Sequence, residues 1–519
     1  MNRRIVLGLL FSGATAGAFA QEGRQQQDKL NLQETVVQSQ NAVFLQQMQV
    51  DNLGESAISY TNEDGSFKHP LLANKSQYFG FKSSRFQDLK GWKLYGSFNL
   101  KAGKEKDVAY TTQLNPLRLN PYILVDSLQG DWNKQHYGFD VQVASPYFHD
   151  RVAVGLGLSY QVSTGARQRD PRPQNTQNLL NLKPAVAYKL DEHNIVGLYG
   201  QYNYFVEDLT VTNVNTNTVH NIYKLIGLGE YVGSSPLFLA AGGFARRYAG
   251  DTFGGGLTYS LNKGDFKGYV EGFYNHHKET ATDGTTYPQN PGTHRYHAYG
   301  FNASLSQTQD YGIHSLRASW DQKDIANTEY HQYQDPITKV YETLFSGVFN
   351  TNLVTQSSLS YQFGKLNGKD LVWKAGVGAQ YQGVDNRYAT NLSQQTADRL
   401  TYQADFTHYF MAKDQSGFVV QLGGAYADVL KTVFNYPEKS YATNFVAKEI
   451  LYPTNAFLST KFWQANAAVQ YVFKPMQKTG SQLYIKASGS YLKPTTTNEY
   501  FAKKMSRTTA EIALGIYSF

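Results

Sequence analysis

Apolar and polar residues alternate along this chain with a period of two, most clearly between residues 151 and 162. Every second residue of that stretch, from Val152 to Val162, is apolar, and most of the residues between them are small or polar. Successive side chains of a β-strand point to opposite faces, so this alternation predicts a strand with one apolar face. A half-buried strand of a soluble β-sandwich would show the same pattern, so a single copy does not separate the two.

The same alternation recurs in at least five other stretches, at residues 92–100, 371–381, 418–426, 463–473 and 483–491. Each is close to the roughly 9–11 residues that a tilted strand needs to cross the hydrocarbon layer of a membrane. Aromatic residues tend to stand at the ends of the apolar rows, where membrane interfaces favour them. The pattern therefore predicts an all-β fold, a transmembrane antiparallel up-and-down β-barrel. Two or three soluble all-β domains would also fit the length.

The connections between these stretches alternate in length. Short polar turns are predicted at residues 87–90, 191–194, 262–265, 366–368, 413–416 and 476–480. Long loops are predicted at about residues 104–131, 165–178, 279–291, 321–351, 384–397 and 431–455. Short periplasmic turns and long outer loops are typical of outer-membrane barrels. Counting hairpins gives about 18 strands, within a range of 16 to 20. Within residues 223–261, the count assumes turns at residues 233–236 and 249–251.

The composition excludes a helical membrane protein. After the first 20 residues, no apolar run approaches the roughly 20 residues of a spanning helix. A hydrophobic content of 41% with 39 Tyr and 45 Gly is typical of a barrel, because polar residues of the lumen dilute those that face lipid. The chain has no Cys, which excludes a lipoprotein anchor and a disulfide framework. The net charge of +7 is small for 519 residues and does not indicate nucleic-acid binding.

The first 54 residues are expected to lie outside the barrel wall. Residues 1–20 have the pattern of a cleaved signal peptide, with Arg3 and Arg4 before an apolar core and Ala18-Phe19-Ala20 before the cleavage point. Export through this signal would place the mature chain in the envelope of a Gram-negative bacterium. Residues 21–54 are expected to form a periplasmic arm and plug segment, and residues 55–519 the barrel.

Within the arm, residues 21–32 are rich in Gln and charge, which predicts a flexible segment. Apolar residues recur at roughly helical spacing between residues 34 and 49. Two interpretations stay open for that part. It is a short helical plug in the periplasmic mouth of the barrel, or an N-terminal helix that covers the rim or stays mobile.

The last strand ends on Tyr517 and Phe519. A terminal Phe with an aromatic residue two positions earlier resembles the signal by which outer-membrane barrels are handed to their insertion machinery. The alternation there is impure, because Ile512, Leu514 and Ile516 lie on the parity opposite Phe519.

Three segments, residues 39–45, 92–98 and 165–175, resemble an uncharacterised family of outer-membrane β-barrels from Bacteroidetes-type envelopes. The resemblance implies a single barrel in the outer membrane and supplies no catalytic residues. The Asn-Ala-x-x-Leu pattern at residues 41–45 is also similar to plug-bearing channels of the fatty-acid transporter type. Residues 34–37, Glu-Thr-Val-Val, resemble the peptide by which TonB-dependent transporters are energised, but the chain lacks room for the large plug domain of that family.

An arginine cluster is the first candidate site. Arg167, Arg169 and Arg172 surround Asp170 within six residues, and Pro171 and Pro173 stiffen the backbone. The cluster could select anions at the pore entrance or bind lipopolysaccharide phosphates. Alternatively, Asp170 pairs with an arginine and the loop is purely structural.

Two further pairs are weaker candidates. His277 and His294 would approach each other across a hairpin and could share a metal ion, although no carboxylate or thiol accompanies them at a fixed offset. Arg246 and Arg247 could face lipid phosphates at the outer rim, line the lumen, or form a solvated strand end.

The expected lumen mixes both charge signs with amides, which favours a hydrated interior without a strong ion preference. Its predicted members are Glu271, Lys374, Gln380, Asp405, Gln464 and Lys486. No nucleophile stands in a recognisable catalytic frame, so an enzyme and a bound cofactor are not expected. Two functions remain: a channel or transporter for a small solute, and a barrel that docks other envelope proteins through its Tyr-rich loops. Outer-membrane lipid, lipopolysaccharide and the insertion machinery are the expected partners.

Overall fold

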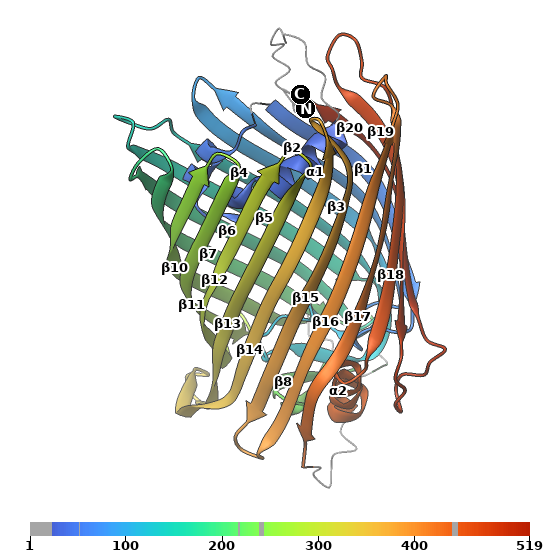
Figure 1. The fold of residues 1–519 in the computed structure, drawn as a ribbon. Coiled ribbons are helices and arrows are strands. Elements are labelled where there is room, and N and C mark those ends of the chain that lie inside the picture. The colour runs from blue at the N-terminus through green and yellow to red at the C-terminus, as the bar shows by residue number, and fades with distance from the viewer. Residues whose placement is uncertain (1–22, 51, 216–217, 219, 238–242, 438–444) are drawn as a thin grey trace, which may run out of the picture.

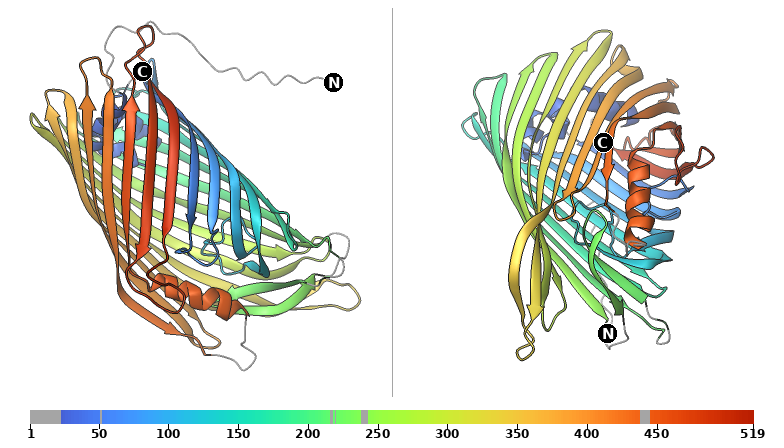
Figure 2. Two further views of the ribbon diagram at one scale, coloured as in Figure 1. Left: turned by 90° about the vertical axis from the view of Figure 1, so that its right-hand side faces the viewer. Right: turned by 90° about the horizontal axis from the view of Figure 1, so that it is seen from below.

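The protein is an antiparallel β-barrel with a few short helices (Figures 1 and 2). The computed structural model describes residues 23–50, 52–215, 218, 220–237, 243–437 and 445–519. The predicted signal peptide, residues 1–20, lies outside the described residues. No helix among the described residues is long and apolar enough to cross a membrane.

Eighteen strands form the closed ring. Their bounds are β1 (Asn52–Gly65), β2 (Lys75–Leu89), β3 (Trp92–Thr111), β4 (Leu124–Ala144), β5 (Val152–Arg167), β6 (Arg172–Lys189), β7 (Asn194–Thr212), β10 (Phe244–Lys263), β11 (Phe266–Asp283), β12 (Gln289–Gln309), β13 (Gly312–Gln334), β14 (Tyr341–Asn367), β15 (Asp370–Tyr388), β16 (Ser393–Met411), β17 (Gly417–Asn435), β18 (Phe462–Val472), β19 (Gln482–Pro494) and β20 (Arg507–Ser518).

The ring closes between its first and last strands. Strand β1 pairs with β2 on one side and with β20 on the other, in a register that runs from Gly54 opposite Ser518 to Gly65 opposite Arg507. Consecutive strands pair in order, except that β7 pairs directly with β10. The remaining hairpin, β8 (His220–Gly227) and β9 (Glu230–Leu237), pairs with the start of β4 and stays outside the ring. Closure leaves the ring itself without an edge strand, and the predicted count of about 18 strands is confirmed.

The two turns assumed within residues 223–261 are wrong. Residues 233–236 lie inside β9, and residues 249–251 lie inside β10. The prediction took Gly, Ser and Pro as signs of a turn, but these residues occur here within paired strands. The predicted number of strands in the ring is nevertheless right, because β7 pairs directly with β10 and the β8–β9 hairpin is not part of the ring.

Several of the predicted long loops are also wrong. Strands β13 and β14 continue past the ring, so that only residues 335–340 connect them in place of the predicted loop 321–351. Residues 284–288 and 389–392 likewise replace loops expected at 279–291 and 384–397. Polar residues in these stretches marked them as loops, but their backbone groups are satisfied by a sheet that extends into water. The predicted short turns occur at the ends of the paired strands.

The two faces of the wall have opposite chemistry. The apolar rows predicted from the sequence point outward, with exposed fractions of 45% for Val154, 46% for Leu156 and 60% for Val377. Residues of the other parity point inward, as in β5, where Ala153 is fully buried. An outer surface of large, exposed apolar side chains is unfavourable in water and favourable in lipid.

The two ends of the barrel carry different segments. The N-terminal segment comprises α1 (Gly23–Gln33), η1 (Thr35–Gln38) and η2 (Ala42–Gln47), and it lies inside the end where the short turns and the C-terminus are found (Figures 1 and 2). We call this end the plug end. The opposite end, the loop end, carries β8, β9, η3 (Ala447–Leu451) and α2 (Tyr452–Leu458).

The flexible arm predicted for residues 21–32 is wrong for most of that range, because residues 23–33 form helix α1. Residues 34–49, where helical spacing was noted, contain only the short 3₁₀ turns η1 and η2. The polar residues of α1 suggested disorder because no apolar face accompanies them in the sequence. In the fold they meet charged partners on the lumen wall.

Candidate functional site

The N-terminal segment binds the wall by apolar packing in its second half. Val43 and Phe44 are almost fully buried against Ala153 and Ala187 of the wall, and Phe44 meets Tyr269 edge to face at 5.7 Å. Small wall residues make room for this contact. A Cβ at Gly197 would lie 2.9 Å from the Phe44 ring, so only glycine permits the approach there. The 3₁₀ half is thus packed like a protein core.

The first half of the segment is held by charges. Asp28 of α1 forms ion pairs of 2.9 Å with Arg24 in the same helix and with Lys374 of β15, and it accepts a hydrogen bond of 2.6 Å from the Tyr409 hydroxyl. Burial alone would raise the pKa of Asp28, but the charges of Arg24 and Lys374 outweigh it and lower the pKa. The Asp28 carboxylate therefore stays charged at neutral pH and ties α1 to the wall.

A second segment enters the lumen from the loop end. The connection between β3 and β4, residues 112–123, which we call the inserted loop, reaches strands on another part of the ring. Arg118 at its centre lies between two carboxylates, Glu207 of β7 at 3.4 Å and Glu279 of β11 in a closer ion pair. Its guanidinium also lies 4.0 Å from the centroid of the Phe205 ring. Both carboxylates are almost fully buried, so Arg118 neutralises charges that would otherwise be costly there.

The end of the inserted loop is anchored by a second arginine. Arg246 of β10 pairs with Asp283 through two bonds of 2.5 and 2.8 Å and donates to the Tyr122 carbonyl oxygen at 3.0 Å. The Tyr248 hydroxyl donates to the same carbonyl at 2.9 Å. Planar two-point pairing of this kind fixes orientation as well as charge. The inserted loop is consequently held at its middle and at its end.

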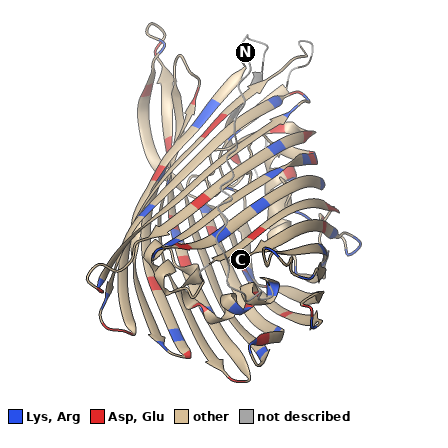
Figure 3. Cartoon of the chain, turned by 90° about the horizontal axis from the view of Figure 1, so that it is seen from above, with Lys and Arg blue, Asp and Glu red and all other residues tan. Residues whose placement is uncertain are grey.

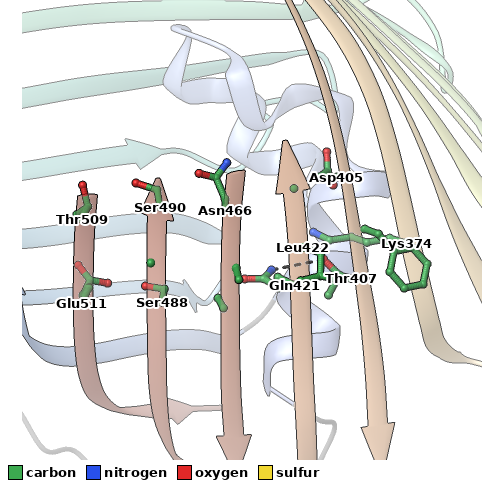
Figure 4. A pocket seen from close by; sticks show the side chains of 15 residues that line it. Lys374, Asp405, Thr407, Gln421, Leu422, Asn466, Ser488, Ser490, Thr509 and Glu511 are labelled. Carbon is green, nitrogen blue, oxygen red and sulfur yellow. Dashed lines mark hydrogen bonds between the residues drawn. The ribbon is translucent and has the colours of Figure 1, made fainter. Parts of the chain in front are cut away.

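Polar cavities lie along the lumen wall, and one of them borders the N-terminal segment. One cavity of about 700 Å³ lies between α1 and strands β1 to β3, β19 and β20, with charges of both signs around it. Another of about 390 Å³ lies along β15 to β20, where Lys374, Asp405 and Glu511 face one space with amides and hydroxyls (Figure 4). Basic and acidic residues are interspersed around the wall (Figure 3). The expected mixed interior is what these residues provide.

The predicted arginine cluster does not act as one unit. Arg167 is fully buried, pairs with Asp126 and donates to the Pro171 carbonyl, whereas Arg172 pairs with Asp170 at 2.7 Å. Asp170 also accepts backbone hydrogen bonds from residues 214 and 215. These contacts match the structural interpretation, in which Asp170 pairs with an arginine. Arg169 is exposed, and its predicted roles toward anions or lipopolysaccharide stay predictions.

Arg246 and Arg247 point to opposite sides of the wall. Arg246 is buried in the lumen in the contacts described above, while Arg247 is about half exposed and lies 3.4 Å from Asp208. The alternation of a strand separates them, so the pair is not a single rim site.

His277 and His294 do come together, with ring centroids 5.7 Å apart. The expectation that no carboxylate accompanies them is wrong, because Glu279 lies 3.6 Å from His277 and pairs across the ladder with His294. Each ring has its own hydrogen-bond partner, Thr252 for His277 and Asn327 for His294. In the part of the chain that the structure describes, no group of three or more His, Cys, Asp or Glu has metal-binding geometry.

Tyr517 faces the lumen and packs against the N-terminal segment. Its ring stacks on Tyr484 with centroids 4.8 Å apart and lies in one apolar cluster with Leu32 of α1, with Phe519 packed against that cluster. The parity noted in the sequence explains this placement, because Ile512 and Leu514 take the outward positions. Recognition of Tyr517 and Phe519 by insertion machinery stays a prediction.

Sequence reasoning missed the residues that occupy the lumen, above all Asp28, Arg118, Glu207 and Glu279. Arg118 sits in a stretch read only as an outer loop, and its partners lie 89 and 161 residues away in the sequence. The available signal was weak: two acidic residues, Glu207 and Glu279, occur near the same ends of their strands.

A family of unknown function, DUF6850, matches residues 42–518, and the chain belongs to this family. No curated protein matches this chain. Among solved structures, a FadL homologue of Pseudomonas aeruginosa is 10% identical with a TM-score of 0.34, covering 94% of this chain and 95% of that one. OpdK of Pseudomonas aeruginosa with vanillate is 11% identical with a TM-score of 0.34, covering 90% and 98%. The siderophore receptor PiuA of Acinetobacter baumannii is 8% identical with a TM-score of 0.40, covering 90% and 82%. These are similarities of barrel fold alone.

Proposed function

We propose that this member of a family of unknown function is an outer-membrane channel or transporter that passes a small solute. The observation that carries the proposal is the arrangement of the lumen. Two separate segments occupy it, one from each end, and polar cavities of about 390 to 700 Å³ remain along the wall. A barrel that served only as a membrane anchor would need neither the hollows nor two separate internal segments.

The orientation follows from the connections. The plug end has the short turns, which face the periplasm in barrels of this kind, and the loop end faces outward. A solute would enter past the inserted loop, cross the polar interior, and leave past the N-terminal segment. The cavity between α1 and β1 to β3 offers a route beside the helix. The mixture of charges along it supports a solute that is polar and carries no large net charge.

Conductance in planar lipid bilayers tests the proposal. The full mature chain, the same chain without residues 23–50, and the full chain with Arg118→Ala are reconstituted under identical conditions. We expect the smallest current from the full chain and larger ones from both variants. A fourth protein that combines the two changes should give the largest current. Osmotic swelling of proteoliposomes in neutral solutes is the parallel measurement. No current and no swelling from any of these proteins would refute a channel.

A second candidate function, docking of another envelope protein, has its own observation. The hairpin of β13 and β14 extends beyond the ring, and its apolar side chains are in water: Ile337 is 88% exposed, Leu344 66% and Phe345 54% (Figure 2). Exposed apolar side chains on a projecting hairpin favour protein contacts. Cross-linking from native membranes discriminates the two, because docking requires a stoichiometric partner that is lost with Leu344→Ser.

A further inference from the structure

A third cavity, of about 560 Å³, lies against the inserted loop. Residues 117–120 of the loop form one side, and strands β6, β7 and β10 to β13 form the rest. We call it the outer chamber. Its volume lies within the range of roughly 300–1,000 Å³ that is common for ligand sites in proteins. Because the inserted loop forms part of its lining, a solute that passes the loop would meet this space.

Part of the outer chamber is lined by polar side chains that make no hydrogen bond within the protein, although the Lys323 ammonium lies 5.7 Å from the centroid of the Tyr296 ring. Gln201, Asn203, Asn275, Asp321 and Lys323 line it, and none of these side chains forms a hydrogen bond or ion pair with another described residue. The Asn275 Oδ1 atom is buried without a partner. All five residues are half-buried, and their free polar groups face the cavity, where water or a ligand can reach them. Buried polar atoms are normally hydrogen-bonded, so the Asn275 Oδ1 atom is the one that most calls for such a partner.

In contrast to these side chains, the neighbouring polar groups of the chamber are hydrogen-bonded within the protein. Asn120 donates to Glu279 at 2.7 Å, Thr252 bonds to His277 at 2.8 Å, and His294 bonds to Asn327 at 2.7 Å. One side of the chamber is therefore a finished hydrogen-bond network that fixes its shape. The other side keeps donors and acceptors free.

The fixed charges of the chamber do not favour an ion. Arg118 and Lys323 supply two positive charges, and Glu279 and Asp321 supply two negative ones, so the lining is neutral when the histidines are neutral. Arg118 is already saturated by Glu207 and Glu279. An anion or cation would lose water on entering and find no unbalanced charge to replace it.

The free groups suit hydroxyls instead. Each amide of Gln201, Asn203 and Asn275 offers both donors and an acceptor, which is the combination that a hydroxyl group satisfies in both directions. The Phe273 ring, also in the lining, supplies an apolar face beside them. A sugar ring presents hydroxyls around its edge and C–H groups on its faces.

We propose that the outer chamber binds a neutral sugar of one or two rings. Gln201, Asn203 and Asn275 would bind its hydroxyls, Asp321 and Lys323 would each bind a further hydroxyl, and Phe273 would pack against a ring face. The inference deepens the proposed function by naming the class of solute that the channel admits.

Titration calorimetry of the purified full-length barrel in detergent tests the inference. Glucose, galactose, mannose and maltose are the probes, and sodium glutamate and lysine hydrochloride are the charged comparators. We expect at least one sugar to bind and neither comparator to do so. Asn203→Ala and Asp321→Asn should each weaken sugar binding at least fivefold. Asn466→Ala, a matched lumen amide in the cavity of Figure 4, should leave it unchanged.

A fourth variant tests whether the inserted loop keeps sugars out of the chamber. Glu207→Gln weakens the hold on the inserted loop without altering a side chain of the chamber lining. If neither the wild type nor Glu207→Gln binds any of the four sugars, the inference is overturned. It is also overturned if Asn203→Ala and Asn466→Ala bind equally well, or if a charged comparator binds in the chamber instead.

Failure of this inference and failure of the proposed function give different results. Sugar binding that depends on Asn203, without current or swelling, would preserve the chamber and refute the channel. Sugar-driven swelling with the same rate in wild type and Asn203→Ala would preserve the channel and refute the chamber.

Discussion

The two segments that occupy the lumen are built on different physical principles. The N-terminal segment is spread across the plug end, with an apolar half in a close-packed cluster and a helical half in an ionic one. The inserted loop is anchored at two buried arginine sites, at Arg118 and Arg246, with further hydrogen bonds such as that from Asn120 to Glu279. A segment that is held by many moderate contacts tolerates the loss of one of them. In contrast, a buried charge that loses its partner strongly destabilises the structure around it. We infer that the loop end is the easier of the two to open by a single change.

Arg118→Ala should have the largest effect. It leaves the carboxylates of Glu207 and Glu279 buried without their cation, which costs about 3–5 kcal/mol when one partner of a buried pair is removed. We expect faster amide exchange in residues 112–123 and unchanged exchange in residues 23–33, measured by hydrogen–deuterium exchange. Arg247→Ala, a neighbouring arginine on the outer surface, is the control. Unchanged exchange in the loop would show that Arg118 does not hold it.

Asp28→Ala should have a smaller effect at the plug end. The change removes the partner of Arg24, Lys374 and Tyr409, but both cations are partly exposed and water can replace the ion pairs. We expect a loss of about 2 kcal/mol in the local stability of α1, with the 3₁₀ half still bound by its apolar contacts. Limited proteolysis should cut within residues 23–33 and spare residues 42–47. Asp265→Asn, in an exposed turn at the same end, is the control; release of the whole segment by Asp28→Ala would contradict the division into two halves.

Acid should loosen the loop end before the plug end. His69, in the connection between β1 and β2, contacts the ring of Phe457 in α2. Burial, aided by the charge of Lys68, lowers the pKa of His69 to about 4. A detached His69 would titrate near 6.5 and bind more protons, so this contact is fully stable above about pH 6.5 and weakens as the pH falls toward 4. Asp28 behaves differently. Its pKa is lowered, so the stability that it contributes persists above about pH 3.8 and is lost only below.

Hydrogen–deuterium exchange at pH 7 and pH 4.5 distinguishes the two ends. After correction for intrinsic rates, exchange in residues 66–74 should rise at pH 4.5, while residues 23–33 should stay protected. His69→Asn should remove the pH dependence of residues 66–74. Equal loss of protection in residues 66–74 and 23–33 would show that the two ends of the barrel do not respond to acid independently.

Gln46→Ala should give the smallest effect. The Gln46 amide donates hydrogen bonds of 2.8 Å to the carbonyl oxygens of Gly91 and Ser145 in two short turns at the plug end. Their loss should cost about 1 kcal/mol, because the apolar cluster around Phe44 remains. A shift of that size in the local opening free energy of residues 42–47 is the expected readout. A much larger shift would mean that hydrogen bonds, not apolar packing, hold this half.

The barrel could be predicted because its pattern is local. The alternation of residues 151–162 depends only on which neighbours are apolar, and the structure places those side chains outward as expected. Turn positions within residues 223–261 were not predictable in the same way, because Gly and Ser permit a turn without requiring one. The continuation of β13 and β14 past the ring was missed for a related reason: polar residues there suit a hydrated strand as well as a loop.

The sequence by itself determined that the wall has one apolar and one polar face, because a period of two sorts side chains to opposite faces regardless of what lies far away. Only the tertiary structure decided what fills the water side. Lys374 meets Asp28 across 346 residues of chain, and Arg118 meets Glu279 across 161. Pairing at such distances depends on how the closed ring brings its strands around a common space, which no local pattern of residues encodes.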